Sequence, residues 1–374
     1  GERRAAEWIA DRLREHGWPV RVEEERAHGG YWWPLGLANA GAALAGGWLS
    51  VRPRSRWRRA LASLVGATAA AAIWDDVSGG RLWLRRALLP HRTTWNVVAE
   101  AGDSRAERTL VLVAHHDAAH SGLVFHPAIP RASMRLFARA FERSKQTAPI
   151  MFGVWLGPVF TAAGGLLGSP ALRRTGLALS AGATAAMADI GRSQVVPGAN
   201  DNLAAVAVLI ALARSLSERP LEGLRVLLVS TGSEESFSEG MHGFLRRHEG
   251  DLARERTEIV ALECLGGRDM VLLEGEGMLA MRKYDPALSA AVGDAAASAG
   301  VELVGPYRTV GATDALPALR RGWRTATLAS IDETKLPRNY HWPNDEPDAL
   351  DYGTIERALA ICQELLQGMA ARAP

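Results

Sequence analysis

Apolar and polar residues follow the periods of helices and strands over most of the chain. Ala5, Ile9 and Leu13 recur every four residues within 2–15, which predicts an amphipathic helix. Apolar runs of strand length recur further on, at residues 109–114, 223–230, 258–263, 269–274 and 324–330. Helical patterns lie among them, at residues 201–216, 286–300 and 354–369. This order predicts a single three-layer α/β/α domain over residues 1–374, with a mostly parallel, mixed central sheet.

Two long apolar segments interrupt this pattern. Residues 29–51 carry no charge over 23 positions, and a second uncharged run, 60–74, follows a short basic segment. Residues 146–172 are uncharged over 27 positions, and 175–188 are uncharged after two arginines. We therefore predict two apolar helical hairpins inserted into the α/β domain, at residues 29–92 and 127–192.

The length of these segments suits a membrane. About 20 residues suffice to cross a hydrocarbon core of about 30 Å, and the first run of each pair is longer than that. Several tryptophans lie near the ends of the first pair, as is typical of side chains at the headgroup level: Trp32, Trp33, Trp48, Trp57, Trp74 and Trp83. Two interpretations stay open. The hairpins attach the protein to a membrane, or they form a soluble lid that shapes an apolar substrate pocket.

Arginines bear on the orientation in a membrane. The hairpin tips carry a set of them: Arg52, Arg54, Arg56, Arg58, Arg59, Arg173 and Arg174. Cytoplasmic loops of membrane proteins carry an excess of Lys and Arg. By this rule the hairpin tips would lie in the cytoplasm, and the α/β domain would lie on the other side of the membrane. The opposite side is basic as well, through Arg81, Arg85, Arg86, Arg92, Arg131, Arg135 and Arg139, so the charge bias is weak.

The overall charge argues against one class of partner. The chain has 43 Lys plus Arg and 41 Asp plus Glu, so no strong basic field favours nucleic acid. Only Cys264 and Cys362 are present, which excludes a disulfide framework but leaves the redox compartment open.

Polar residues that can bind metal follow the ends of several predicted strands or lie in loops. They are His115, Asp117, Asp201, Glu234, Glu235, Glu263 and His341. In open α/β sheets, functional sites lie at the carboxyl ends of the strands. The set therefore suggests two divalent cations that share one bridging carboxylate.

Each residue also has a simpler interpretation. His115 fits a hydrogen-bonded core histidine, Asp201 a helix N-cap, Glu263 an ion pair with an arginine, and His341 a solvated loop residue. Two adjacent glutamates after Gly232 also fit an exposed turn. These interpretations require a separate accident at every position, whereas a metal centre accounts for all of them.

Six motifs together resemble peptidase family M28, which includes bacterial zinc aminopeptidases, glutamate carboxypeptidase II and glutaminyl cyclases. The motifs are HHD at 115–117, GANDN at 198–202, EE at 234–235, LECLG at 262–266, GATDALPALRRGWRTATL at 311–328 and YHWPNDEPD at 340–348. The resemblance covers most of the chain outside the hairpins. It implies one or two zinc ions, with Asp201 as the bridging ligand, Glu235 and His341 on one ion, and His115 and Glu263 on the other.

The same resemblance implies two further roles. Glu234 would be the general base that takes a proton from the attacking water, and Asp117 the carboxylate that fixes the tautomer of His115. Many family members have aspartate where this chain has Glu263, and glutaminyl cyclases work with one zinc, so the number of ions stays open. The nearby histidines, His116, His120 and His126, are expected to support the site or lie at the surface.

The function implied is a zinc-dependent exopeptidase acting on a peptide or amide substrate, foremost an aminopeptidase. Alternatives are a hydrolase of N-acyl amino acids or other non-peptide amides, and a glutaminyl cyclase-like enzyme. A non-catalytic relative would be expected to have lost some of these residues. A carboxypeptidase would need cations for the substrate carboxylate, and four candidates are present: Arg282, Lys283, Arg308 and Arg338.

Overall fold

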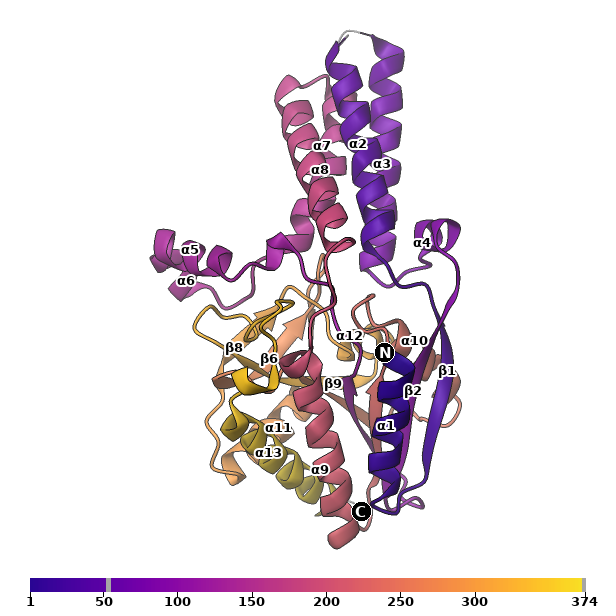
Figure 1. Ribbon diagram of the computed structural model, residues 1–374, viewed down its shortest axis with the longest axis vertical. Coiled ribbons are helices and arrows are strands. Elements are labelled where there is room, and N and C mark those ends of the chain that lie inside the picture. Colours follow the sequence, from indigo (N-terminus) through magenta and orange to yellow (C-terminus); the bar gives the residue numbers. More distant parts are fainter. Residues whose placement is uncertain (52–54, 372–374) are drawn as a thin grey trace.

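The protein consists of an α/β domain with a helical bundle projecting from one end (Figure 1). The structure, a computed structural model, describes residues 1–51 and 55–371. Arg52 and Arg54, which the orientation argument uses, lie outside the described residues.

Nine strands form one mixed sheet in the α/β domain. They are β1 Val20–Ala27, β2 Arg92–Gly102, β3 Thr109–His115, β4 Arg225–Thr231, β5 Thr257–Glu263, β6 Asp269–Glu276, β7 Arg282–Lys283, β8 Val304–Thr309 and β9 Arg324–Ile331. Their order is β1-β2-β4-β3-β5-β9-β6-β7, and β8 pairs with β6. The central strands β4, β3, β5 and β9 are parallel, whereas β1, β2 and β7 pair only in the antiparallel sense. The predicted mostly parallel, mixed sheet is confirmed.

Helices cover both faces of the sheet. Four pack on one face, namely α1 Glu2–Arg14, α9 Ala204–Glu218, α11 Pro286–Ser298 and α13 Tyr352–Ala371, and two on the other, α10 Glu239–His248 and α12 Ala315–Arg320. Because side chains alternate along a strand, Leu110 and Leu112 of β3 enter one core while Val111 and Val113 enter the other. The three-layer prediction is confirmed.

The two apolar insertions form helical hairpins that pack together as a four-helix bundle (Figure 1). The helices are α2 Trp32–Val51, α3 Arg56–Val77, α7 Ile150–Leu167 and α8 Pro170–Ile190. Helix α2 packs against α3 and α8, and α7 packs against the same two helices. Three short helices that the sequence did not reveal flank the bundle: α4 Trp83–Leu88, α5 Ala128–Leu136 and α6 Ala138–Arg143.

Small residues let the bundle helices approach closely. A Cβ added to Gly66 of α3 would lie 2.6 Å from the backbone nitrogen of Ala162 in α7, and one added to Gly176 of α8 would lie 2.5 Å from that of Thr161. Such contacts are typical of helix pairs in membranes. Many large apolar side chains point outwards, and Leu44 of α2 is 74% exposed, although Leu35 and Leu49 of the same helix are buried.

Within residues 1–51 and 55–371, three helices are long and apolar enough to cross a membrane, judged by length and composition: α3, α7 and the helical stretch Ala199–Glu218. The last belongs to the core of the α/β domain, so composition alone does not decide the environment. Helix α2 is not among the three, because its tryptophans, glycines and Asn39 lower its mean hydropathy. Helix α3 has 22 residues and so extends beyond the uncharged run 60–74 at both ends.

Candidate metal centre

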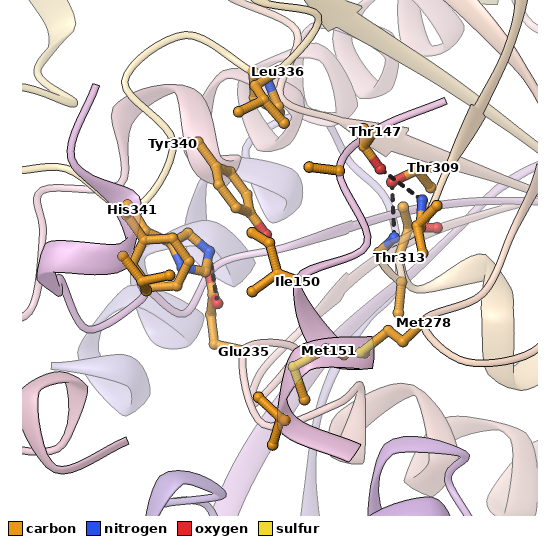
Figure 2. A pocket seen from close by; sticks show the side chains of 18 of the residues that line it. Thr147, Ile150, Met151, Glu235, Met278, Thr309, Thr313, Leu336, Tyr340 and His341 are labelled. Carbon is orange, nitrogen blue, oxygen red and sulfur yellow. Dashed lines mark hydrogen bonds and ion pairs between the residues drawn. The ribbon is translucent and has the colours of Figure 1, made fainter. Parts of the chain in front are cut away.

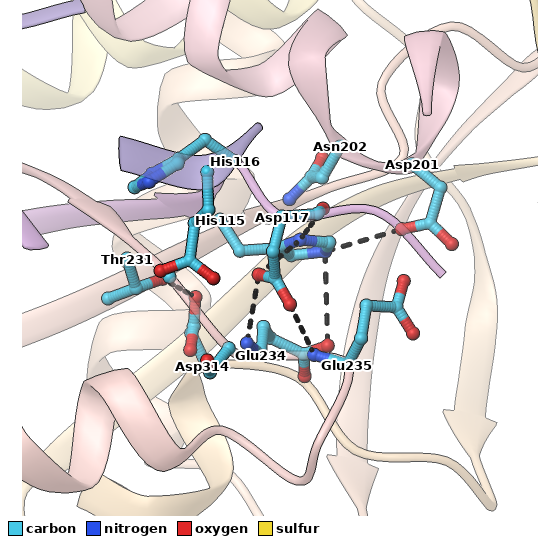
Figure 3. A network of polar contacts seen from close by, with 12 residues as sticks. His115, His116, Asp117, Asp201, Asn202, Thr231, Glu234, Glu235 and Asp314 are labelled. Carbon is cyan, nitrogen blue, oxygen red and sulfur yellow. Dashed lines mark hydrogen bonds and ion pairs between the residues drawn. The ribbon is translucent and has the colours of Figure 1, made fainter. Parts of the chain in front are cut away.

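The predicted site residues converge at the carboxyl ends of neighbouring parallel strands. Figure 3 shows five of them side by side: His115, Asp117, Asp201, Glu234 and Glu235. His115 is the last residue of β3 and Glu263 the last of β5, while Glu234 and Glu235 follow β4 after two residues. Since β4, β3 and β5 are adjacent and parallel, their ends meet at one edge of the sheet, as the sequence predicts.

Asp201 reaches the same place from the turn before α9. The backbone N–H groups of Asn200 and Asp201 donate to the carboxylate of Asp345, at 2.8 and 3.1 Å. The Asp201 side chain makes no capping hydrogen bond to α9, whose N-cap residue is Leu203. The N-cap interpretation is therefore wrong, and the carboxylate of Asp201 faces the strand ends.

Asp201 lies between the two histidines. Its Oδ1 is 3.3 Å from His115 Nε2, and its Oδ2 is 3.4 Å from His341 Nε2. His115 Nε2 is also 3.6 Å from Glu263 Oε1, and His341 Nε2 is 3.2 Å from Glu235 Oε2. All five predicted ligands thus belong to one buried cluster.

The two tightest groups in this cluster cut across the predicted ligand pairs. Potential ligand atoms of His115, Asp201 and Glu235 lie within 4.8 Å of one another, as do those of Asp201, Glu263 and Cys264. Sequence reasoning did not assign Cys264 to the site, although its place beside Glu263 was a signal. Burial raises the pKa of its thiol well above the ordinary value, and the thiol donates to Glu263 Oε1 at 3.3 Å.

The adjacent glutamates are not an exposed turn. Their side chains are only 12% and 15% exposed for Glu234 and Glu235. Burial raises the pKa of both carboxyl groups. The positive charge of a nearby histidine opposes this rise, His115 at Glu234 and His341 at Glu235. Glu234 Oε2 lies 3.9 Å from His115 Nε2, and Ser238 donates a hydrogen bond to the other carboxylate oxygen at 3.2 Å.

Asp117 contacts His115 and also holds the glutamate turn. The Nδ1 of His115 lies 3.1 Å from the backbone carbonyl of Asp117 and 3.5 Å from its carboxylate. That carboxylate accepts the backbone N–H groups of Glu234 and Glu235, at 2.9 and 3.1 Å. This second contact, which the sequence did not reveal, ties the ends of β3 and β4 together.

Several buried polar atoms of the cluster have no hydrogen-bond partner among the described residues. They are His115 Nε2, Asp201 Oδ2, Glu235 Oε1 and His341 Nδ1. Burial would raise the pKa of Asp201, but the two histidines, at 3.3 and 3.4 Å from its carboxylate, hold it far below its ordinary value. Burial would lower the pKa of His341, but Glu235 and Asp201 raise it to about 10. The cluster therefore has excess negative charge and stabilises positive charge.

The three neighbouring histidines are engaged elsewhere. His116 Nδ1 lies 2.9 Å from the hydroxyl of Ser230, and burial lowers the pKa of this histidine to about 4. His120 donates to the Ser193 carbonyl at 2.8 Å, and His126 accepts the backbone N–H of Ala128 at 3.1 Å.

Residues 183–366 match the model of peptidase family M28. This segment, just under half of the chain, is a family M28 sequence. The match includes every predicted site residue except His115 and Asp117, which the fold supplies from β3 and the turn after it. A search of curated proteins found no match.

Solved structures of low sequence identity share the fold. The glutaminyl cyclase of Porphyromonas gingivalis is 14% identical, with a TM-score of 0.54 and coverage of 98% of this chain and 90% of that one. A leucine aminopeptidase precursor of Bacteroides thetaiotaomicron is 14% identical, with a TM-score of 0.52 and coverage of 96% and 87%. A Zn-dependent exopeptidase of Parabacteroides distasonis is 12% identical, with a TM-score of 0.54 and coverage of 98% and 89%. The family and these folds support a metal-dependent hydrolase of the metallopeptidase class.

Proposed function

We propose that this M28 protein is a zinc-dependent exopeptidase that removes residues from a free amino terminus. The observation that carries this proposal is the charge of the pocket at the metal centre. The pocket has a volume of about 430 Å³, and its acidic lining residues are Glu234, Glu235 and Glu263. Lysine and arginine are absent from its described lining.

This lining favours a substrate amine over a substrate carboxylate. A substrate ammonium group would meet Glu234, which is not needed as a metal ligand, whereas a substrate carboxylate would find no lysine or arginine in the described lining. The cationic candidates for a carboxypeptidase lie elsewhere, since Arg282 and Lys283 are exposed on β7 and Arg338 pairs with Asp332 at 3.0 Å. The same argument disfavours N-acyl amino acids, which carry a free carboxylate.

The cluster fits zinc. The contact of His115 Nδ1 with the Asp117 carbonyl requires a proton on that nitrogen, so the neutral ring directs the Nε2 lone pair at the oxygens of Asp201 and Glu263. Lone pairs facing one another in a buried site require a cation or a proton between them. Imidazole and carboxylate are zinc ligands, and we propose that Asp201 bridges, with Glu235 and His341 on one side and His115 and Glu263 on the other.

Bound zinc would polarise the scissile carbonyl and lower the pKa of the attacking water. Glu234 lies beside this cluster but is not needed as a ligand, so its carboxylate can take the proton of the water and deliver it to the leaving amine. Asp117 positions Glu234 by accepting its backbone N–H.

Metal analysis and a substrate panel test this proposal. The purified protein should contain one or two zinc ions, which His115→Ala and His341→Ala should reduce. Among leucine anilide, an N-acyl leucine and an N-terminal glutamine peptide, the anilide should be hydrolysed fastest, and a chelator should stop the reaction. Full metal content in both variants would refute the ligand assignment. Cyclisation of the glutamine peptide without anilide hydrolysis would instead favour a glutaminyl cyclase, the activity named for one structural neighbour.

We also propose that the helical bundle lies in a membrane, with the α/β domain on the extracytoplasmic side. Large apolar side chains of the bundle are exposed: Trp33, Leu37, Leu44, Val51, Trp57, Leu61, Leu64, Leu166 and Leu167. Helix α5 lies at the base of the bundle (Figure 1) and combines exposed Ile129 and Leu136 with Arg131 and Arg135, as is typical of interfacial helices. Recovery of the monodisperse full chain in the soluble fraction without detergent would favour the lid instead.

A further inference from the structure

We propose that the pocket accommodates one long aliphatic chain, and that the preferred substrates are amides with a free amino group near the metal centre and this chain extending into the bundle. The inference rests on the proposed hydrolase function and specifies its substrate class. One continuous pocket carries it, because the same lining includes Glu235 and His341 of the cluster and residues of both α7 and α8.

One wall of the pocket is a single face of α8. Ala178, Gly182, Ala186 and Ile190 line it at intervals of four residues, with Met187 beside them. At 1.5 Å per residue this wall is about 18 Å long. Its small side chains leave room along the helix for a narrow ligand.

The opposite wall joins the bundle to the α/β domain. Ile150 and Met151 at the start of α7 lie close to Met278, and Glu235 and His341 lie further along the same pocket (Figure 2). A ligand can therefore contact the carboxylates with one end and α8 with the other.

The chemistry of the α8 wall favours an aliphatic chain over a peptide. Every pocket-lining side chain of α7 and α8 is apolar, and the backbone groups within these helices already bond to one another. A peptide lying there would leave N–H and C=O groups without partners, each at a cost of about 1–3 kcal/mol. An aliphatic chain has no such groups and gains from leaving water.

The far end of the pocket is open. Ala178 and Gly182 are exposed, and a Cβ added to Gly182 would meet nothing within 4 Å. A chain longer than the wall can continue past this point, and with the bundle in a bilayer it would remain in hydrocarbon.

The reaction is hydrolysis and needs no other reactant than water. The water oxygen bonds to the carbonyl carbon, the C–N bond breaks, and the amine leaves with a proton. For leucine dodecylamide the products are leucine and dodecylamine. The chain can equally be attached to the carbon that carries the free amine, as in the ethylamide of 2-aminotetradecanoic acid.

Leucine alkylamides from ethyl to dodecyl, assayed at a fixed detergent ratio, test the inference. Burial of each methylene group is worth up to about a fourfold change in binding, so kcat/KM should rise with chain length. Gly182→Leu fills the open space at the α8 wall and should lower the dodecyl-to-ethyl ratio of kcat/KM at least tenfold. Ala185→Leu adds a side chain to an exposed position of α8 outside the pocket lining and should leave that ratio as in the unmodified protein.

A binding measurement separates this inference from catalysis. Metal-free protein should bind dodecylamine more tightly than butylamine in calorimetry, and Gly182→Leu should remove the difference. The inference would be overturned if leucine anilide were hydrolysed but kcat/KM did not change with chain length in either the nitrogen-linked or the carbon-linked series of amides. The peptidase proposal would then still stand. Chain-length-dependent binding without hydrolysis of any amide would refute the peptidase proposal alone.

Discussion

Helices α7 and α9 have similar apolar compositions but opposite distributions of side chains. Helix α7 and the 20-residue stretch Ala199–Glu218, which ends in α9, are each long and apolar enough to cross a membrane. Of the apolar window, 67% is buried within the protein in the stretch that ends in α9, against 33% in α7. Helix α9 buries Val206, Leu209 and Leu212 beneath the sheet. Helix α7 buries small residues such as Gly157 and Gly164. The α/β domain thus buries most of its large apolar side chains, whereas the bundle leaves many of them exposed although it buries others, such as Leu35, Leu49 and Ile73. This difference fits the proposed membrane setting of the bundle.

The two regions also handle charge differently. The α/β domain concentrates buried carboxylates at the sheet edge, where the proposed zinc would offset their charge. The bundle has a buried charged link at its base, where fully buried Arg85 of α4 contacts Asp76 of α3 and Glu239 of α10. Arg85 also donates to the carbonyl of Ser236 at 2.7 Å. This link connects the bundle to the turn that carries the two glutamates.

The largest loss of activity should come from substitution of Glu234. This substitution tests whether the catalytic residues lie in the α/β domain alone. Glu234→Gln should lower kcat by about 10²–10⁴-fold, because an amide cannot take the proton of the attacking water. Zinc content should stay at the level of the unmodified protein. A kcat of Glu234→Gln within tenfold of that of the unmodified protein would show that Glu234 is not the general base.

Arg85 should give the next largest effect and tests whether the two regions are coupled. Arg85→Met leaves Asp76 and Glu239 buried without their cation and should cost about 3–5 kcal/mol of stability, seen as a lower unfolding temperature. Exposed Arg86→Met is the matched control on the same helix. Equal unfolding temperatures for the two variants would show that the ion pairs do not hold the regions together.

The sequence predicted the helix and strand order well because each pattern is local. His115, Glu234 and Glu263 could be placed because a strand end fixes their position, and parallel order brings the ends together. The remaining contacts depend on side chains far apart in the chain, such as Arg85 with Glu239 and Asp117 with the backbone of Glu234. No periodicity records these pairs. The pocket along α8 was also hidden, because Ala178 and Gly182 are unremarkable until α7 and the α/β domain lie opposite them.

Leu44 tests directly whether the surroundings of the bundle differ from those of the α/β domain. A lysine near the middle of a membrane helix costs about 2.5–3.5 kcal/mol. Leu44→Lys should therefore reduce the fraction of protein that stays in alkali-washed membranes. Val304→Lys, at a 47% exposed apolar position of the α/β domain, should leave that fraction unchanged. If both variants partition alike, the exterior of the bundle is in contact with water.

Glu276 should give the most gradual effect, one that builds up only as the pH rises, and it tests how the α/β domain holds a buried carboxyl group away from the cluster. Burial raises the pKa of Glu276 to about 8, and its carboxyl group accepts the backbone N–H of Thr313 at 2.7 Å. Between the ordinary pKa of a glutamate and pH 8, the folded state keeps a proton that the unfolded state releases. Stability should therefore fall as pH rises through this range, by at most about 1.4 kcal/mol per pH unit.

Glu276→Gln keeps the hydrogen-bond acceptor and cannot ionise. Urea titrations in detergent should therefore show that its stability relative to the unmodified protein grows from pH 5 to pH 8. Glu274→Gln, at an exposed position of the same strand, should follow the unmodified protein, and parallel stability curves for Glu276→Gln and the unmodified protein would mean that Glu276 does not carry the proton.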